Sequence, residues 1–160
     1  MSPALLLEAA RAEDLGALLD LERDSYTNPW NLRGFRGALA AEGALALVLR
    51  APFAARDATR GIQAYCMAQL VLDELHVHNL VVRPGARGRG LGRRLLGLVL
   101  GLAARRGACV ALLEVRQSNG PAIQLYRSLG FEVVGSRRGY YARPPEDAVL
   151  LRKDGPLARG

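Results

Sequence analysis

Residues 87–93 read Arg87-Gly88-Arg89-Gly90-Leu91-Gly92-Arg93 and lie between a predicted strand, residues 75–82, and an apolar predicted helix, residues 91–106. Phosphate binds well where several backbone N–H groups converge on it, and the three glycines allow such a close approach. A helix that begins at the loop directs unpaired N–H groups and its positive dipole end toward an anion. The arginines add positive charge. The stretch therefore predicts a phosphate-binding loop, although the same residues could form only a solvated turn.

Two familiar phosphate loops do not match this stretch. The Walker loop needs glycine, four residues and then Gly-Lys-Ser or Gly-Lys-Thr, and the chain contains no such run. The dinucleotide fingerprint G-x-G-x-x-G would begin at Gly88 and would need glycine at the position of Arg93. It would also follow the first strand of its unit, whereas this loop follows the fourth predicted strand. The nucleotide-binding folds are therefore excluded.

Apolar residues at helical or alternating spacing predict the remaining elements. Strands are expected at 4–9, 44–50, 62–71, 75–82, 109–115, 131–134 and 148–151, helices at 12–21, 32–41, 91–106 and 121–129, and loops at 51–60 and 136–147. The early strands would form an antiparallel meander, and the unit around the phosphate loop would add residues 109–115 parallel to residues 75–82. The order β-α-α-β-β-β-α-β-α-β-β predicts an α/β fold of the α+β kind. Its sheet would be mixed and mostly antiparallel, with helices on both faces.

The 160 residues fit one domain, which we expect to span residues 1–153, with residues 154–160 as a flexible tail. No stretch has the form of a signal peptide or is long and apolar enough to cross a bilayer, so we expect a cytoplasmic protein without membrane contact. A monomer is expected. The net charge of +7 comes from 22 basic residues, of which only Lys153 is a lysine. Scattered arginines without interleaved aromatic residues do not favour direct readout of nucleic acid.

Leu80-Val81-Val82-Arg83-Pro84, followed by Arg87-x-x-Gly90-x-Gly92, resembles the acetyl-CoA signature of the GNAT N-acetyltransferase superfamily. The expected element order is also the order of that superfamily, so the resemblance covers nearly the whole chain. It implies acetyl-CoA as the donor, with the pantetheine arm against the backbone of Leu80, Val81 and Val82. It further implies that the pyrophosphate is held by the backbone of Gly88, Arg89, Gly90, Leu91, Gly92 and Arg93.

The second half of the chain resembles one branch of this superfamily closely, the bacterial ribosomal-protein alanine acetyltransferases and their relatives that act on protein N-termini. The matching positions are Leu113-Glu114-Val115-Arg116, Ser118-Asn119, Ala122, Leu125-Tyr126, Leu129-Gly130-Phe131, Asn28-Pro29-Trp30, Leu72-Asp73-Glu74 and Arg137-Arg138-x-Tyr140-Tyr141. The resemblance implies transfer of acetyl to the N-terminal amine of a protein. The expected acceptor is the N-terminal alanine of small-subunit ribosomal protein 18.

Glu114 and Tyr126 are the candidate catalytic residues. Glu114 interrupts an apolar strand, where a carboxylate is costly unless it is functional or paired with an arginine, either Arg116 or one on a neighbouring strand. The resemblance places a catalytic glutamate at this position. It assigns Tyr126 to protonating the departing thiolate, although an amphipathic tyrosine could instead pack its ring in the core. Asn119 matches a position that hydrogen-bonds the pantetheine arm, and it could equally be a helix N-cap.

The expected acceptor side contains Trp30, Glu74, His78, Tyr140 and Tyr141. Glu74, His76 and His78 alternate onto one strand face, but no other His or Cys completes a metal-ligand set, so no metal is expected. His78 is an alternative base, because an unperturbed imidazole has a pKa of about 6.5. The resemblance makes the loop with Tyr140 and Tyr141 one wall of the peptide site, opposite Trp30 and Tyr26. Acids at positions 73, 74, 146 and 147 are expected to meet a basic ribosomal tail.

Other acceptors remain open. A small amine such as an antibiotic or a polyamine, or a protein lysine, would be acetylated by the same chemistry. The α-amine is the easier nucleophile, since its pKa is roughly 7.7–8.0 against about 10.4 for lysine. A non-catalytic acyl-CoA sensor or a basic RNA-binding module could use the same scaffold, but the presence of both Glu114 and Tyr126 disfavours a sensor.

Overall fold

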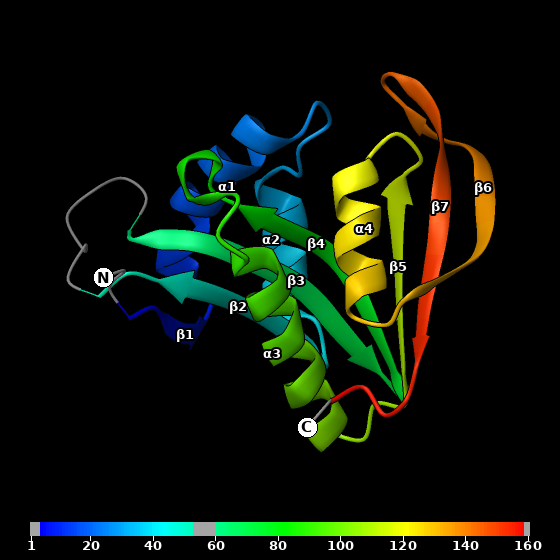
Figure 1. Ribbon diagram of the computed structural model, residues 1–160. Coiled ribbons are helices and arrows are strands. Elements are labelled where there is room, and N and C mark those ends of the chain that lie inside the picture. The colour runs from blue at the N-terminus through cyan, green and yellow to red at the C-terminus, as the bar shows by residue number, and fades with distance from the viewer. Residues whose placement is uncertain (1–3, 53–59, 159–160) are drawn as a thin grey trace.

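The computed structural model describes residues 4–52 and 60–158, and Figure 1 shows their path. Seven strands form one sheet in the order β1-β2-β3-β4-β5-β7-β6. The strands are β1 Leu6–Ala9, β2 Ala44–Arg50, β3 Ile62–Val71, β4 Glu74–Val82, β5 Val110–Arg116, β6 Glu132–Ala142 and β7 Pro145–Asp154. The helices are α1 Leu15–Ser25, α2 Leu32–Ala40, α3 Leu91–Arg105 and α4 Gly120–Ser128, with short 3-10 turns η1 Ala12–Asp14 and η2 Pro84–Ala86.

The pairing of the strands confirms the expected mixed and mostly antiparallel sheet. Within the described residues, β4 and β5 form the parallel pair and the other pairs are antiparallel. Helix α3 lies between β4 and β5 in the chain, as a parallel connection requires. In the same residues, no helix is both long and apolar enough to cross a membrane.

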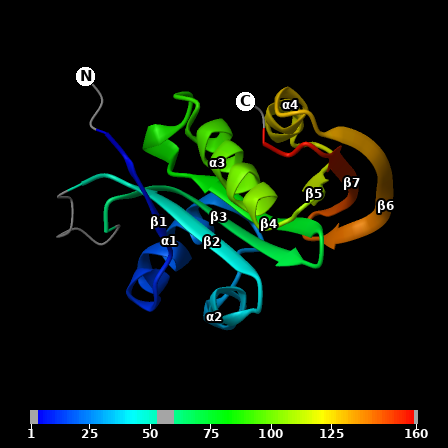
Figure 2. The same cartoon turned by 90° about the horizontal axis from the view of Figure 1, so that it is seen from below.

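Helices cover both faces of the sheet, α3 and α4 on one and α1 and α2 on the other, as Figure 2 shows. On the α3 face, Leu47 and Cys66 are buried together with Leu95. On the opposite face, Val48 and Tyr65 belong to a second buried cluster. Neighbours in sequence enter different clusters because successive side chains of a strand point to opposite faces.

Strand β4 separates from β5 about halfway along its length. The parallel pairing joins residues 74–77 to residues 110–113 and then ends, and Figure 1 shows the two strands diverging from there. On its other edge β4 stays paired with β3 as far as Val82, but the register shifts around His78, which has no partner. An extra residue of this kind is a β-bulge, which bends a strand and re-aims its side chains. The divergence opens a cleft in the sheet between β4 and β5.

The bulge also exchanges the two faces along β4. Leu75 and Val77 lie in the cluster beneath α3. Uninterrupted alternation would place Val81 on that same face, yet Val81 lies in the cluster with α1 and α2, and Leu80 and Val82 pack toward α3 instead. In the sequence, the exchange coincides with two adjacent polar residues, His78 and Asn79, between the apolar Leu75 and Val77 on one side and Leu80 to Val82 on the other.

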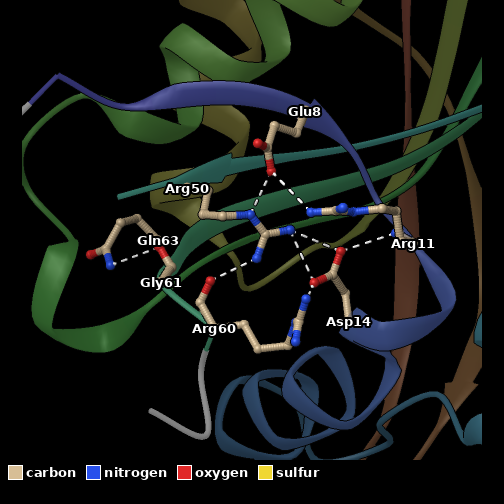
Figure 3. Close-up of polar contacts among 7 residues, drawn as sticks. All are labelled: Glu8, Arg11, Asp14, Arg50, Arg60, Gly61 and Gln63. Atoms are coloured by element: carbon tan, nitrogen blue, oxygen red, sulfur yellow. Dashed lines mark hydrogen bonds and ion pairs between the residues drawn. The ribbon is translucent and has the colours of Figure 1, made fainter. Parts of the chain in front are cut away.

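A charged network ties β1 and η1 to the hairpin formed by β2 and β3. Asp14 has a fully buried side chain and accepts hydrogen bonds from Arg50 at 2.9 Å, from Arg60 at 2.9 Å and from the N–H of Arg11 at 3.0 Å. Figure 3 shows the guanidinium groups converging on Asp14 and on Glu8, which Arg50 contacts at 2.6 Å. Because these residues come from separate elements, the network fixes the N-terminal segment against the sheet.

One prediction at the level of elements differs from the structure. Residues 136–147, expected as a loop, belong mostly to β6 and β7, which form one long hairpin. The pattern failed there because β6 is exposed over nearly its whole length, so no apolar alternation marks it. Strand β7 runs to Asp154 and Leu157 is 3% exposed, so the chain packs against the domain as far as Leu157. The loop expected at 51–60 lies largely outside the described residues.

Candidate active site

A cleft of about 600 Å³ lies between the end of β4, the start of α3 and helix α4. Most of the residues predicted to bind the cofactor line it: Leu80, Val81, Val82, Arg87, Gly88, Gly90, Leu91, Gly92 and Asn119, with Tyr126 beside them. Arg89 and Arg93 come from the same loop but are not part of this lining. The fold therefore gathers one continuous surface from three segments of the chain.

The loop before α3 presents a run of unpaired backbone donors. The N–H of Arg94 donates to the carbonyl of Gly90 at 3.0 Å. The N–H groups of residues 88–93, by contrast, have no acceptor within residues 4–52 and 60–158. Gly88 and Gly90 have φ values of 78° and 74°, which residues with a side chain rarely adopt. Free amides at a helix N-terminus bind anions readily, so the loop fits a pyrophosphate.

Arg87 is held by this protein's own acceptors. Its Nε donates to the carbonyl of Val82 at 3.0 Å and its Nη2 to the Ser25 hydroxyl at 3.3 Å. These bonds link the loop to the end of β4 and to the end of α1. The arginine of the signature thus has a clear role in fixing the loop, while a direct contact with phosphate stays a prediction.

Asn119 caps α4. Its side-chain oxygen accepts a hydrogen bond from the N–H of Ala122 at 3.3 Å, as the N-cap alternative requires. The same residue borders the 600 Å³ cleft, which is the predicted cofactor cleft. The cap occupies the carbonyl oxygen and leaves the amide NH₂ group available to a ligand.

Tyr126 on α4 packs its ring in the core and also borders the cleft. The residue is 8% exposed, and its ring meets Phe131 edge-on with centroids 5.9 Å apart. No group of the described residues hydrogen-bonds the hydroxyl. Burial raises the pKa of Tyr126 well above its usual range, so the phenol stays protonated. The ring therefore packs in the core, as one sequence alternative expects, while the role of Tyr126 as a proton donor stays a prediction.

Two further pockets adjoin the cofactor cleft where β4 and β5 diverge. One of about 450 Å³ shares Leu80, Asn119 and Tyr126 with that cleft. The other, of about 560 Å³, lies toward β7 and β6. Both are lined by Trp30, His78, Glu114 and Tyr141. Since the linings overlap, the three pockets form one passage that runs from the phosphate loop past Tyr126 and Glu114 to Tyr140.

Glu114 stands on β5 at the centre of this passage. Its Oε1 lies 3.4 Å from Nη2 of Arg137 on β6, and its side chain is 27% exposed. A hydrogen bond to Glu114 also raises the pKa of Tyr140. The arginine pairing left open by the sequence is therefore present, with Arg137 and not with Arg116. The carboxylate nevertheless still borders both pockets.

His78, the bulge residue, faces the same pockets from β4. Desolvation and the neighbouring His76 lower the pKa of His78, against an opposing effect of Glu114, so the imidazole is neutral near pH 7. The ring of Trp30 lies 6.4 Å from that of His78, centroid to centroid. Glu74 pairs instead with His76 at 3.1 Å and borders neither pocket, so the structure does not bring it to the predicted site.

The α1–α2 connection and the β6–β7 turn meet at one backbone carbonyl. The oxygen of Arg143 accepts hydrogen bonds from Thr27 at 3.1 Å, from Asn28 at 2.7 Å and from Arg116 at 2.9 Å. The Arg116 guanidinium also lies 4.2 Å from the centre of the Tyr141 ring. Tyr140 and Tyr141 were expected in a loop but lie on β6, where these bonds hold the end of the strand against the connection that carries Trp30.

Three of the four acidic residues expected to meet a basic peptide, Glu74, Glu146 and Asp147, are engaged elsewhere. Glu146 pairs with Arg116 at 3.3 Å and accepts the N–H of Ser118, contacts that lower the pKa of Glu146. Asp147 accepts the N–H of Gly139 at 2.8 Å. Within residues 4–52 and 60–158, no group of His, Cys, Asp or Glu side chains is arranged to hold a metal ion.

Sequence reasoning missed two residues that border the 450 Å³ pocket, Glu22 and Asn79. Glu22 is 1% exposed, and both of its oxygens accept from Nδ2 of Asn79, at 2.7 and 2.6 Å. A signal for it was present, because Glu22 follows the buried Leu18 by four residues on the apolar face of α1, where a carboxylate is out of place.

Known proteins resemble this chain over nearly its full length. Residues 15–131 match the Acetyltransferase (GNAT) family. The ribosomal protein bS18-alanine N-acetyltransferase of Salmonella typhimurium is 38% identical over 140 residues, covering 86% of this chain and 89% of that protein. The enzyme of that name from Escherichia coli K12 is 33% identical over 147 residues, covering 91% and 94%. The crystal structure of the ribosomal-protein-S18-alanine N-acetyltransferase from Escherichia coli has a TM-score of 0.84 at 30% identity, covering 98% of this chain and 96% of that one.

These similarities confirm the resemblance read from residues 80–92 and 113–131. The element order, the mixed sheet and the glycine loop before α3 all agree with it. The chain belongs to the Acetyltransferase (GNAT) family and is an N-acetyltransferase.

Proposed function

We propose that this enzyme transfers acetyl from acetyl-CoA to the N-terminal α-amine of a protein, and that the N-terminal alanine of ribosomal protein bS18 is its acceptor. The observation that carries the proposal is the single passage opened by the divergence of β4 from β5. One end has unpaired amides for a pyrophosphate, and the middle is lined by Glu114, His78 and Tyr126. The identity of at least 33% with two bS18-alanine acetyltransferases supports this acceptor.

The donor end fits acetyl-CoA through backbone groups. The N–H groups of residues 88–93 would hold the pyrophosphate, and the backbone of Leu80 and Val82 would run beside the pantetheine arm. Arg83 donates its N–H to Gln63 on β3, so alternation along the strand turns the N–H of Val82 toward the cleft. That amide would stabilise the oxygen that becomes negative during transfer. Acetyl-CoA supplies the activated acetyl thioester.

The acceptor amine must lose a proton before it attacks. Glu114 is positioned to take that proton, directly or through water, because its carboxylate borders both pockets. His78 faces the same space as a neutral imidazole and is the second candidate base. An α-amine has a pKa of roughly 7.7–8.0, so a modest base is sufficient for it. A lysine amine, with a pKa of about 10.4, would need more help.

The departing thiolate needs a proton, and Tyr126 is positioned to supply it. Tyr126 borders both the cofactor cleft and the 450 Å³ pocket, and burial keeps its hydroxyl protonated. A protonated donor without a competing hydrogen bond in the described residues is well suited to a general acid.

A comparison of amines tests the proposal. The enzyme is incubated with acetyl-CoA and a peptide beginning with alanine, with the same peptide blocked at its N-terminus but carrying lysine, and with spermidine. Thiol release gives the rate, and mass spectrometry locates the acetyl group. We expect turnover on the free N-terminus, and little on the blocked peptide or the polyamine. Absence of turnover on any free N-terminus, with rapid acetylation of lysine or spermidine, would overturn the proposal.

A further inference from the structure

Glu22 is a buried carboxylate with polar contacts to three different elements. Nδ2 of Asn79 donates to both of its oxygens, and the hydroxyl of Tyr65 on β3 lies 3.4 Å from Oε2. The backbone of Trp30, in the α1–α2 connection, also favours its charged form. No ion pair among residues 4–52 and 60–158 includes Glu22. The carboxylate is therefore satisfied by neutral donors alone.

Such a carboxylate is expensive at this position. Burial raises the pKa of Glu22, and the donors Asn79, Tyr65 and Trp30 only partly offset that effect. An apolar residue of similar volume would pack in the second core at lower cost, because buried polar groups add little net stability. Buried polar contacts of this kind are known instead to select one arrangement of the surrounding elements.

Asn79 and Trp30 belong to two different segments that line the 450 Å³ pocket, which is the predicted acceptor pocket. Asn79 directly follows His78, the bulge residue, in the part of β4 that has left β5. Trp30 stands in the α1–α2 connection, and its ring is 6.4 Å from the ring of His78. Trp30 and His78 both line the 450 Å³ and 560 Å³ pockets. One carboxylate thus accepts hydrogen bonds from the residue after the bulge and also interacts with the backbone of Trp30, on a separate segment of the pocket lining.

We propose that Glu22 is a positioning residue of the acceptor pocket, whose carboxylate joins Asn79 on β4 to Trp30 and so sets the spacing between these two segments. It acts through His78 and Trp30 and not on the acetyl group. The inference deepens the proposed function and rests on it for its kinetic consequences. Its structural consequence, the placement of Trp30, does not depend on the identity of the acceptor.

Exchanging the donor and the acceptor of the hydrogen bond between Asn79 and Glu22 gives a kinetic test. Glu22→Gln replaces one acceptor oxygen by an NH₂ group that faces the NH₂ of Asn79, so we expect the KM for the acceptor peptide to rise about tenfold. The Kd for acetyl-CoA, measured by calorimetry, should not change, because the cofactor cleft lies outside these contacts. In the double variant Glu22→Gln with Asn79→Asp, the donor and acceptor are exchanged and the KM should return to within about threefold of the wild type.

Glu13→Gln is the matched control, since it makes the same chemical change at an exposed position just before α1. Melting temperatures accompany every variant. If Glu22 has a purely structural role, the variants should have lower melting temperatures with an unchanged KM. The double variant should then lose more stability than Glu22→Gln. Either of these results would overturn the inference.

Fluorescence supplies a test that needs no acceptor. Trp30 is the single tryptophan of the chain, so its emission reports on this segment alone. In Glu22→Gln we expect a red shift and stronger quenching by acrylamide, both reversed in the double variant. Unchanged emission and quenching in folded Glu22→Gln would contradict the inference even if peptide acetylation is confirmed. If the wild type acetylates no peptide but the Trp30 signal responds as expected, the proposed acceptor fails and the positioning role stands.

Discussion

The carboxylate of Glu114 on β5 lies 3.4 Å from the guanidinium of Arg137 on β6, across the intervening strand β7. The pair is half open to solvent, with 58% of the arginine side chain and 27% of the glutamate side chain exposed. Solvent-exposed pairs of this kind contribute at most about 1 kcal/mol to stability. The contact therefore orients the glutamate far more than it stabilises the fold.

Replacing Glu114 should affect chemistry and leave donor binding intact. We expect Glu114→Gln to lower kcat about a hundredfold, the usual range for loss of a general base, with the Kd for acetyl-CoA unchanged. Arg137→Gln, the control on the partner side, should change the free energy of unfolding by less than about 1 kcal/mol. Steady-state kinetics and calorimetry measure these effects. If Glu114→Gln kept its rate while His78→Gln lost it, the histidine would be the base.

Removing only the hydroxyl of Tyr126 should separate its two roles. Tyr126→Phe keeps the ring that packs against Phe131 at 5.9 Å, so the melting temperature should stay close to that of the wild type. The rate of transfer should fall about a hundredfold, because the thiolate loses its proton donor. A variant with wild-type kcat would show that Tyr126 is only a core residue.

The loop glycines and the helix glycines of α3 should respond in opposite ways. Gly90 has φ 74°, so Gly90→Ala should cost about 1–2 kcal/mol and weaken acetyl-CoA binding by displacing the loop amides. Gly97 lies inside α3, where an added Cβ meets nothing within 4 Å. Gly97→Ala should therefore raise stability by about 0.5–1 kcal/mol. Chemical denaturation and calorimetry check both variants, and equal donor affinity in both would contradict the assignment of the loop.

The Asp14 network should make stability depend on acid. Burial alone would raise the pKa of Asp14, but the contacts from Arg11, Arg60 and Arg50 outweigh burial and hold that pKa below its usual value of 3.8. Because the pKa is lower in the folded state than in the unfolded chain, the stabilisation is present above pH 3.8 and is lost as the pH falls through the folded value.

Asp14→Asn should accordingly lower the free energy of unfolding by about 3 kcal/mol at pH 7, since it removes the buried negative charge that faces Arg50 and Arg60. The difference from the wild type should narrow below pH 3.8. Urea titrations at pH 7 and pH 3 measure it. A difference that stays constant between the two values would show that the network does not hold a charged Asp14.

The chain's local pattern was sufficient for most of the elements and for the glycine loop before α3. Strands β2 and β3 have the predicted bounds, because each is a nearly continuous apolar run of strand length. The phosphate loop was also readable, since glycines at positions 88 and 90 meet a backbone requirement that depends on adjacent residues alone. Strand β6 could not be predicted at its full length, because an exposed edge strand has no periodic pattern of apolar residues in the sequence.

The amino-acid sequence by itself determined the order of the elements and the glycine loop before α3. Only the tertiary structure decided the bulge at His78, the divergence of β4 from β5 and the partners of the charged side chains. Glu22 meets Asn79 across 57 residues of chain, and Glu114 meets Arg137 across a neighbouring strand. Such contacts depend on strand register, which is set by pairing between distant segments, and a local pattern carries no record of it.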